Sequence, residues 1–331
     1  MKAVVIEQMH AEAKWTEYPD PIVQKGEMKI KIKAAALNHR DVYIQQGLYP
    51  GIIYPVVPGS DGSGLVEEVY APEFQDWIGK SVILNPNKFW GNNEKYQAKP
   101  YQILGMPSQG TLAEYVSIPA DRVVEKPSHL NDEQAAALPL AGLTAYRALF
   151  SRGKLQAGEK ILISGIGGGV ALTALQFALA AQAEVWVSSG SQEKINQAMA
   201  LGAKGGICYN QDSWHKNLLE QSGLFDLIID SAGGKDFSFF PDLCNFGGRI
   251  VFFGGTHGNF TLNPQKVFWK QLDILGSTMG SDLDFNQMIS FVSTHQISPL
   301  VSQSWPAHRI DEAFQCMKES KQFGKIVIQV Q

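Results

Sequence analysis

The chain has 331 residues, of which 44% are hydrophobic and 18% are charged, and its formal net charge is −4. This length and composition suit a well-packed protein of two domains. It shows no basic stripe and no apolar run of transmembrane length, and its first residues lack the long apolar segment expected of a signal peptide. These observations argue against nucleic acid, a membrane and secretion, so we expect a cytoplasmic protein.

Three regions of different texture follow one another along the chain. Residues 1–127 hold short strands and turns, including an alternating polar and apolar strand over 29–33. Residues 128–270 alternate strands with helices, which predicts a doubly wound parallel sheet. Its strands are expected over 160–164, 184–188, 206–209, 226–231 and 249–254, and its helices from 172, over 192–201 and near 214–221.

Residues 271–331 are too few for a domain of their own. They hold a predicted strand over 273–278, helices over 285–293 and near 311–320, and a last strand over 325–330. We expect this region to complete the first domain and the edge of the sheet. The three cysteines are far apart, and each has a hydrophobic neighbour, which is typical of buried, inert thiols: Cys208, Cys244 and Cys316.

A glycine-rich turn follows the predicted strand over 160–164 and opens onto a helix. Strand, glycine turn and helix form the geometry that brings backbone N–H groups to a pyrophosphate, so the turn predicts a dinucleotide site. The spacing Gly165-x-x-Gly168-x-x-Ala171 fits this role, whereas G-x-G-x-x-G does not. A plain tight turn is the alternative. The residues expected to contact the cofactor here are Gly165, Gly167, Gly168, Gly169 and Val170.

The second strand of the predicted sheet indicates which dinucleotide binds. NAD enzymes place an acid at the end of this strand, but here Ser188 and Ser189 stand there, and Lys194 follows within a turn. Hydroxyl groups and a cation favour a 2′-phosphate, so we predict NADPH. The alternative is that Ser188–Ser191 only cap the helix that starts near Gln192, and the nearby Glu193 is unfavourable for a phosphate. Other strand ends expected to line the cofactor are Ser231, Gly254 and Gly255.

Several motifs occur together in a fixed order. They are Asn38-x-x-Asp41-x-Tyr43 with Gly47-Leu-Tyr49, Pro58-Gly-Ser-Asp-Gly-Ser-Gly64, residues 135–146, Asp230-Ser-Ala-Gly-Gly234 and Gly324-Lys325-Ile-Val. In these motifs the chain resembles the medium-chain dehydrogenase/reductase superfamily, and within it the zinc-free quinone-reductase-like branch. The resemblance implies a chaperonin-like (GroES-like) β-barrel catalytic domain of residues 1–127 and 271–331. It also implies an inserted NADPH-binding Rossmann domain, an α/β doubly wound parallel sheet, of residues 128–270.

The same resemblance assigns roles to residues outside the glycine turn. It implies that Thr144 contacts the nicotinamide, that Lys194 and Tyr209 flank the adenosine phosphate, and that Lys325 approaches the cofactor. His39 and Arg40 are expected near the cofactor phosphates. Surface exposure, or a salt bridge from Arg40 to Asp41, is the alternative for this pair.

Two departures from the zinc enzymes of the superfamily predict that no metal is bound. Asn38 and Ser60 stand at the positions of a Cys and a His ligand, and the loop over 90–96 contains no cysteine. Asp61 alone cannot build a tetrahedral site. Without zinc, the chain is expected to reduce substrates that are already activated.

We therefore predict an NADPH-dependent, zinc-independent oxidoreductase that transfers hydride to a quinone, enone or other conjugated carbonyl. The Asn38 amide and the Tyr43 hydroxyl are expected to face this small-molecule substrate, although Tyr43 has a packing role as its alternative. An enoyl-thioester or alkenal reductase, and a non-catalytic NADPH-binding protein, are the competing functions. An exposed last strand over 272–276 predicts a homodimer.

Overall fold

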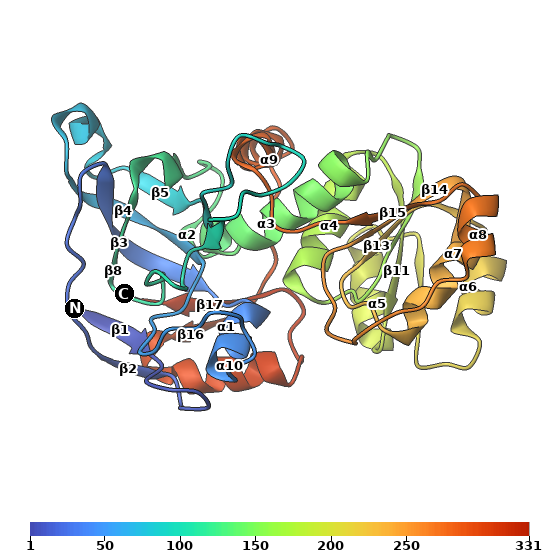
Figure 1. The fold of residues 1–331 in the computed structure, drawn as a ribbon, viewed down its shortest axis with the longest axis horizontal. Helices are drawn as coiled ribbons and strands as arrows, with labels where there is room; N and C mark the ends of the chain where they lie inside the picture. The colour runs from blue at the N-terminus through green and yellow to red at the C-terminus, as the bar shows by residue number, and fades with distance from the viewer. Residues whose placement is uncertain (331) are drawn as a thin grey trace. The chain divides into compact units, whose positions relative to one another are not determined.

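The computed structural model describes residues 1–330, which form two compact units (Figure 1). Unit 1 consists of Met1–Leu140 together with the chain from Ser281 onward, and unit 2 consists of Ala141–Gly280. Both ends of the chain therefore build unit 1, and unit 2 is an insertion within it. None of the helices over residues 1–330 has both the length and the apolar composition needed to span a membrane.

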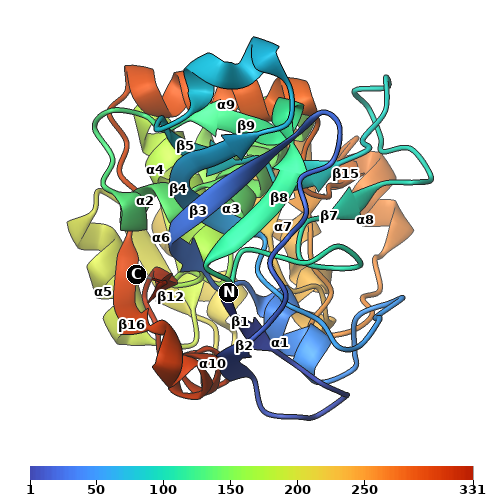
Figure 2. The ribbon, with the colours of Figure 1, turned by 90° about the vertical axis from the view of Figure 1, so that its left-hand side faces the viewer.

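Unit 1 is built on a seven-stranded sheet in the order β16-β17-β3-β4-β5-β9, with β8 paired to β3. Figure 2 shows β3, β4 and β8 side by side. The long strand β3 alternates lysine and isoleucine, and its isoleucines face the core. The strands of this sheet are β3 (Glu27–Ala36), β4 (Asp61–Val69), β5 (Ser81–Leu84), β8 (Tyr115–Pro119), β9 (Val123–Glu125), β16 (Val301–Pro306) and β17 (Lys325–Gln329).

Short strand pairs and four helices complete unit 1. The pairs are β1 (Lys2–Val5) with β2 (Lys14–Glu17), and β6 (Asn87–Lys88) with β7 (Gln102–Ile103). One apolar face of α10, with Ile310, Phe314 and Met317, packs into the core that the sheet encloses. The helices are α1 (His39–Gln45), α2 (Asp132–Ala136), α9 (Asp282–Thr294) and α10 (Ile310–Lys318).

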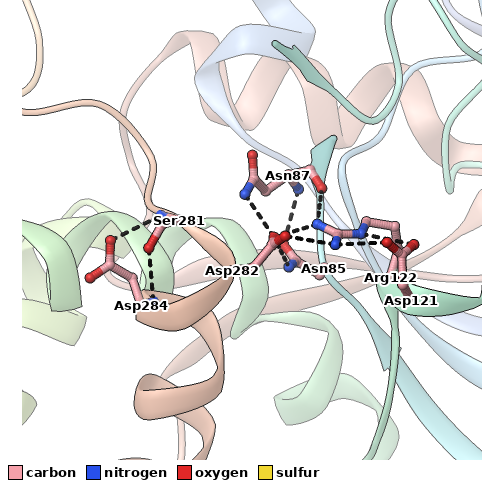
Figure 3. A network of polar contacts seen from close by, with 7 residues as sticks. All are labelled: Asn85, Asn87, Asp121, Arg122, Ser281, Asp282 and Asp284. Atoms are coloured by element: carbon pink, nitrogen blue, oxygen red, sulfur yellow. Dashed lines mark hydrogen bonds and ion pairs between the residues drawn. The ribbon is translucent and has the colours of Figure 1, made fainter. Parts of the chain in front are cut away.

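A polar network connects the start of α9 to the segments around Asn87 and Arg122 of unit 1 (Figure 3). Ser281 and Asp284 form a capping box, in which each side chain accepts the other's backbone N–H at 3.1 and 2.9 Å. Next to it, the buried Arg122 forms an ion pair with Asp282 and donates to the carbonyl oxygen of Asn87 at 2.9 Å. This network is a structural tie between segments that are far apart in sequence.

Unit 2 contains a six-stranded, all-parallel sheet in the order β12-β11-β10-β13-β14-β15. This is the doubly wound order, in which the first strand lies next to the fourth. Ile161, Leu162 and Ile163 of β10 are all fully buried, because both faces of the sheet are covered. The strands are β10 (Lys160–Ile163), β11 (Glu184–Ser189), β12 (Gly205–Cys208), β13 (Phe225–Asp230), β14 (Cys244–Phe252) and β15 (Asp273–Gly276).

The helices of unit 2 alternate with these strands, as predicted. They are α3 (Pro139–Tyr146), α4 (Gly169–Ala180), α5 (Gln192–Ala200), α6 (Trp214–Ser222), α7 (Phe240–Leu243) and α8 (Pro264–Trp269). The predicted α/β fold is confirmed, with a Rossmann-like parallel sheet and a GroES-like unit.

The predicted domain bounds differ from the structure at both ends of unit 2, and one strand of unit 1 was not predicted. The strand β15 pairs with β14, so unit 2 reaches Gly280 and does not end at 270. At the other boundary, α2 lies against β3 and β4, which keeps residues 128–140 in unit 1. The strand β16 was not predicted, because its sequence Val-Ser-Gln-Ser-Trp-Pro lacks an apolar alternation.

Candidate functional site

The motif Asn38-x-x-Asp41-x-Tyr43 lies at the start of α1, which a buried carboxylate fixes. Asp41 is fully buried and accepts the backbone N–H groups of Asn38 at 2.8 Å and of Gly59 at 3.1 Å. Burial raises the pKa of Asp41, and the charge of Arg40 acts against this shift. Asp41 thus ties the start of α1 to the turn before β4.

Three buried side chains meet beside this turn. The Lys325 ammonium, on β17, donates to the carbonyl oxygen of Leu37 at 2.8 Å, to Asn38 Oδ1 at 2.6 Å and to Asp61 Oδ2 at 2.9 Å. Asn38 Nδ2 donates to Asp61 Oδ2 at 2.9 Å. The other oxygen of Asp61 accepts the backbone N–H of Leu140 at 2.7 Å. This cluster of Asn38, Asp61 and Lys325 is called the amide cluster below.

Arg40 lies next to the amide cluster and is also buried, with 8% of its surface exposed. Its Nη1 donates to Ser60 Oγ and, at 2.6 Å, to the carbonyl oxygen of Leu104. The guanidinium group also lies over the Tyr49 ring, 4.9 Å from its centroid. Arg40 is therefore not surface-exposed, and its Nη1 donates to Ser60 and Leu104, whereas His39 of the same pair is exposed.

His39 and Tyr43 lie on the same short helix, with their rings 6.5 Å apart. The His39 side chain is exposed, yet the protein atoms crowded around it and the Lys325 charge lower its pKa. Tyr43 is half-buried, and burial raises its pKa. Within residues 1–330 its hydroxyl forms no hydrogen bond, so the Tyr43 O–H group is available as a hydrogen-bond donor.

The glycine turn of unit 2 has the backbone geometry that a phosphate site needs. Gly165 and Gly167 have φ of +68° and +122°, a region that side chains rarely adopt. Gly168 is the N-cap of α4, which has neither a side-chain cap nor an acid in its first turn. A methyl group built on Gly168 would meet no atom within 4 Å. The start of α4, which includes Gly169 and Val170, therefore fits an anion.

Lys194 adds a positive charge beside this turn. A methyl group on Gly167 would lie 2.6 Å from Cδ and 3.2 Å from Nζ of Lys194, so the lysine packs directly on the turn. Burial lowers the pKa of Lys194, and the charge of Glu193 partly opposes this effect. An ammonium group over a glycine turn is a second observation in favour of a phosphate ligand.

The end of β11 holds the residues that were expected to choose the cofactor. Ser188 and Ser189 are buried, and Ser189 Oγ donates to the carbonyl oxygen of Ile166 at 3.2 Å. Ser191 caps α5 by accepting the backbone N–H of Lys194. The Tyr209 ring lies beside Gly190, where a methyl group would be 3.2 Å from the ring. Ser191 therefore has the capping role, and the contact of Tyr209 with the adenosine phosphate stays a prediction.

The ends of β10 and β13 are joined by a hydrogen bond that sequence reasoning missed. Ser164 Oγ donates to Asp230 Oδ1 at 2.5 Å, and Asp230 Oδ2 accepts the N–H of Gly233 at 2.7 Å. This bond could have been predicted, because neighbouring parallel strands end at the same edge of a sheet. Gly254 packs on Ser231, since a methyl group there would lie 2.0 Å from the Ser231 carbonyl oxygen. Gly255 is exposed next to them.

Thr144 lies elsewhere in unit 2, on α3. Its side chain is buried, and its hydroxyl donates to the sulfur of Met279 at 3.8 Å. The cofactor roles expected for Thr144, for Lys325 and for the residues around the glycine turn stay predictions.

Comparison with known proteins agrees with both units. The protein-family model described as alcohol dehydrogenase GroES-like domain matches residues 24–128. The family model described as zinc-binding dehydrogenase matches residues 169–294. A zinc-type alcohol dehydrogenase-like protein of Leptosphaeria maculans is 36% identical over 94% of this chain and 92% of its own. The chain belongs to the medium-chain dehydrogenase/reductase superfamily.

Further members of the superfamily match over almost their whole length. A crystal structure described as that of an NAD-dependent alcohol dehydrogenase has a TM-score of 0.90, is 34% identical and matches over 100% of both chains. An acryloyl-coenzyme A reductase of Sulfurisphaera tokodaii is 28% identical over 99% of each chain. A quinone oxidoreductase of Homo sapiens is 26% identical over 93% of this chain and 90% of its own.

The superfamily includes zinc enzymes, and the residues of this chain do not suit that metal. Within residues 1–330, no group of three or more His, Cys, Asp and Glu side chains is placed to hold a metal ion. Asn38 and Ser60 offer neither imidazole nor thiolate, and Asp61 Oδ2 accepts from Asn38 and Lys325 instead. Zinc sites use Cys, His and carboxylate ligands in tetrahedral geometry. The side chains at these positions do not fit a catalytic zinc ion.

Proposed function

We propose that this protein is an NADPH-dependent oxidoreductase that reduces conjugated carbonyl compounds, such as quinones and enones, without a catalytic metal. The amide cluster carries the proposal, because Asn38 stands where zinc enzymes of the superfamily have a metal-binding Cys. Its amide is hydrogen-bonded instead to a buried lysine and a buried aspartate. An amide is a weaker electrophile than a metal ion. Substrates whose carbonyl is already activated by conjugation need less polarisation, and they suit such a site.

The cofactor proposal is supported by unit 2. The uncapped start of α4, the open space at Gly168 and the Lys194 ammonium group would hold the phosphates. A reduced nicotinamide, when bound, supplies a hydride, which is a proton with two electrons.

The choice of NADPH over NADH rests on the end of β11. Ser188 and Ser189 stand there without an acid, and Lys194 is the nearby cation. An acid at this place would bind the ribose 2′-hydroxyl of NADH and repel a 2′-phosphate. The solved relative that is 34% identical is described as NAD-dependent, so both cofactors belong in every assay.

Asn38 and Tyr43 are the side chains proposed to act on the substrate. When a hydride adds to the β-carbon of an enone, its electron pair forms the new C–H bond, the C=C pair moves to form the double bond of an enolate, and the C=O π pair moves to the carbonyl oxygen. Asn38 Nδ2 has a second N–H group beyond the one that Asp61 accepts, and it would donate to this oxygen. Tyr43, whose raised pKa keeps it protonated at neutral pH, or water would then give a proton to the α-carbon.

The test is the oxidation of NADPH and NADH, followed by absorbance, with EDTA-treated protein and a panel of quinones, enones and simple ketones. Turnover with the conjugated acceptors, at least tenfold faster with NADPH, is the expected result. Turnover of simple ketones that EDTA abolishes would contradict the metal-free proposal. NADPH binding without turnover of any acceptor would favour a non-catalytic protein.

A thioester reductase is the second candidate, favoured by the similarity to an acryloyl-coenzyme A reductase. An α,β-unsaturated thioester is also a conjugated carbonyl, so the same side chains would serve it. Acryloyl-coenzyme A therefore belongs in the panel, and a kcat/KM far above those of quinones and enones would decide for this candidate.

A homodimer is the proposed assembly. One of the two edge strands of the parallel sheet is β15, whose residues are half-buried or exposed. Pairing of β15 with its copy across a two-fold axis would cover this edge. Light scattering on a size-exclusion column should give twice the mass of 36.4 kDa, and a single-chain mass at micromolar concentration would refute the dimer.

A further inference from the structure

The amide group of Asn38 is held from both ends by opposite charges. Its oxygen accepts from the Lys325 ammonium at 2.6 Å, and its nitrogen donates to the Asp61 carboxylate at 2.9 Å. A rotation of the amide by 180° would place NH₂ against the ammonium and oxygen against the carboxylate. Both contacts would then be repulsive, so the two charges select one orientation of the side chain.

Burial makes this selection strong. Asp61 is fully buried, Lys325 is 5% exposed and Asn38 is 8% exposed. Water therefore screens the two charges only weakly. An exposed asparagine would sample both orientations, whereas Asn38 keeps its second Nδ2–H group in a fixed direction.

We propose that Lys325 and Asp61 are positioning residues that orient and polarise the Asn38 amide, so that its second N–H group stabilises the oxyanion formed from the substrate. The inference rests on the proposed function and extends it to the source of the electrophile. The Lys325 ammonium draws electron density from Asn38 Oδ1, which makes the N–H groups of the same amide stronger donors. The buried lysine thus stabilises the substrate oxyanion indirectly, by polarising the Asn38 amide.

Lys325 acts through Asn38, and not on the cofactor as the superfamily resemblance implied, because its own three donors are already used. An ammonium group has three N–H groups, and they go to Leu37, Asn38 and Asp61. No proton is transferred by any of the three side chains. Hydride addition leaves the negative charge on the substrate oxygen, and the proton that completes the reduction comes from Tyr43 or water.

The test is a mutant cycle with three variants: N38A, the charge-neutral pair D61N/K325M, and the triple variant that combines them. The pair is changed together because removing Lys325 alone would leave a buried carboxylate without its partner. For each protein, kcat and KM with an enone, the Kd for NADPH from fluorescence titration, and the melting temperature are measured. K325R, which keeps the charge, is the conservative variant.

N38A is expected to lower kcat/KM by about 10²-fold, the size of effect seen when one oxyanion donor is removed. D61N/K325M should lower it by about tenfold or more, mainly through kcat, with the Kd for NADPH within about twofold of wild type. Because the pair acts through Asn38, the triple variant should be no slower than N38A. K325R should keep most of the kcat/KM of the wild-type protein.

The matched control is R122M/D282N, which removes another partly buried ion pair of unit 1. It should lower the melting temperature without lowering kcat/KM. The inference would be overturned if the loss of kcat/KM in the triple variant equalled the product of the losses in N38A and D61N/K325M. It would also be overturned if D61N/K325M lost NADPH affinity and kept its kcat. Both results would leave the proposed function intact. A wild-type protein that reduces no conjugated carbonyl would overturn both.

Discussion

Substitutions at two neighbouring glycines of the turn before α4, Gly167 and Gly168, should affect stability and cofactor binding separately. Gly168 has an ordinary backbone conformation with φ of −76°, and a methyl group there meets no protein atom within 4 Å. Gly167 has φ of +122°, and a methyl group there meets Lys194 Cδ at 2.6 Å. The same substitution, Gly to Ala, therefore tests two different properties at adjacent positions.

Gly168→Ala should weaken NADPH binding and leave the fold intact. If the pyrophosphate approaches this turn, the added methyl group displaces at least one phosphate hydrogen bond to a backbone N–H. Such a bond is worth about 1.5–3 kcal/mol, so the Kd should rise about tenfold or more. Stability should stay the same or rise by about 0.4–1 kcal/mol, because alanine restricts the unfolded chain.

Gly167→Ala should instead lower the free energy of unfolding by about 1–3 kcal/mol, since alanine is strained at this φ. The assays are fluorescence titration with NADPH and urea unfolding without cofactor. Gly276→Ala is the control, because its methyl group would only touch Phe252 Cζ at 3.9 Å, in ordinary contact. A Gly168→Ala protein with unchanged NADPH affinity would refute the placement of the phosphates at this turn.

Three further predictions concern single side chains. Burial lowers the pKa of Lys194, so NADPH affinity should be full at neutral pH and fall as the pH rises through a pKa below that of an ordinary lysine. Lys194→Arg should remove this fall. A variant with the same pH profile as the wild type would count against the ammonium contact. Tyr43→Phe should lower kcat with the enone while leaving the Kd for NADPH unchanged, and full turnover would show that water supplies the proton. A disulfide reagent at pH 8 should modify no more than Cys208 and Cys316 in the native protein and three thiols after unfolding, because Cys244 is fully buried and burial raises its pKa to about 12; fast native labelling of three thiols would contradict the packing.

Local patterns in the sequence determined much of this fold. The apolar run over 161–163, the glycine turn and the helical stretch after it are neighbours in the chain, so their order alone predicts strand, turn and helix. The predicted strands of unit 2 lie within a few residues of the observed ones, apart from β14. That strand begins at Cys244, where the run Asn245-Phe-Gly-Gly248 interrupts the apolar pattern.

The candidate site of unit 1 was decided by the tertiary structure. Asn38 and Lys325 are 287 residues apart, and Asp61 and Lys325 are 264 apart, so no local pattern links them. The sequence identified Asn38 as a lost metal ligand and Lys325 as a cofactor contact, without indicating that they touch. They meet because the last strand, β17, pairs with β3, which ends just before α1. A lysine carries three donors in any surroundings, and only the packing of both chain ends in one sheet determines which acceptors they reach.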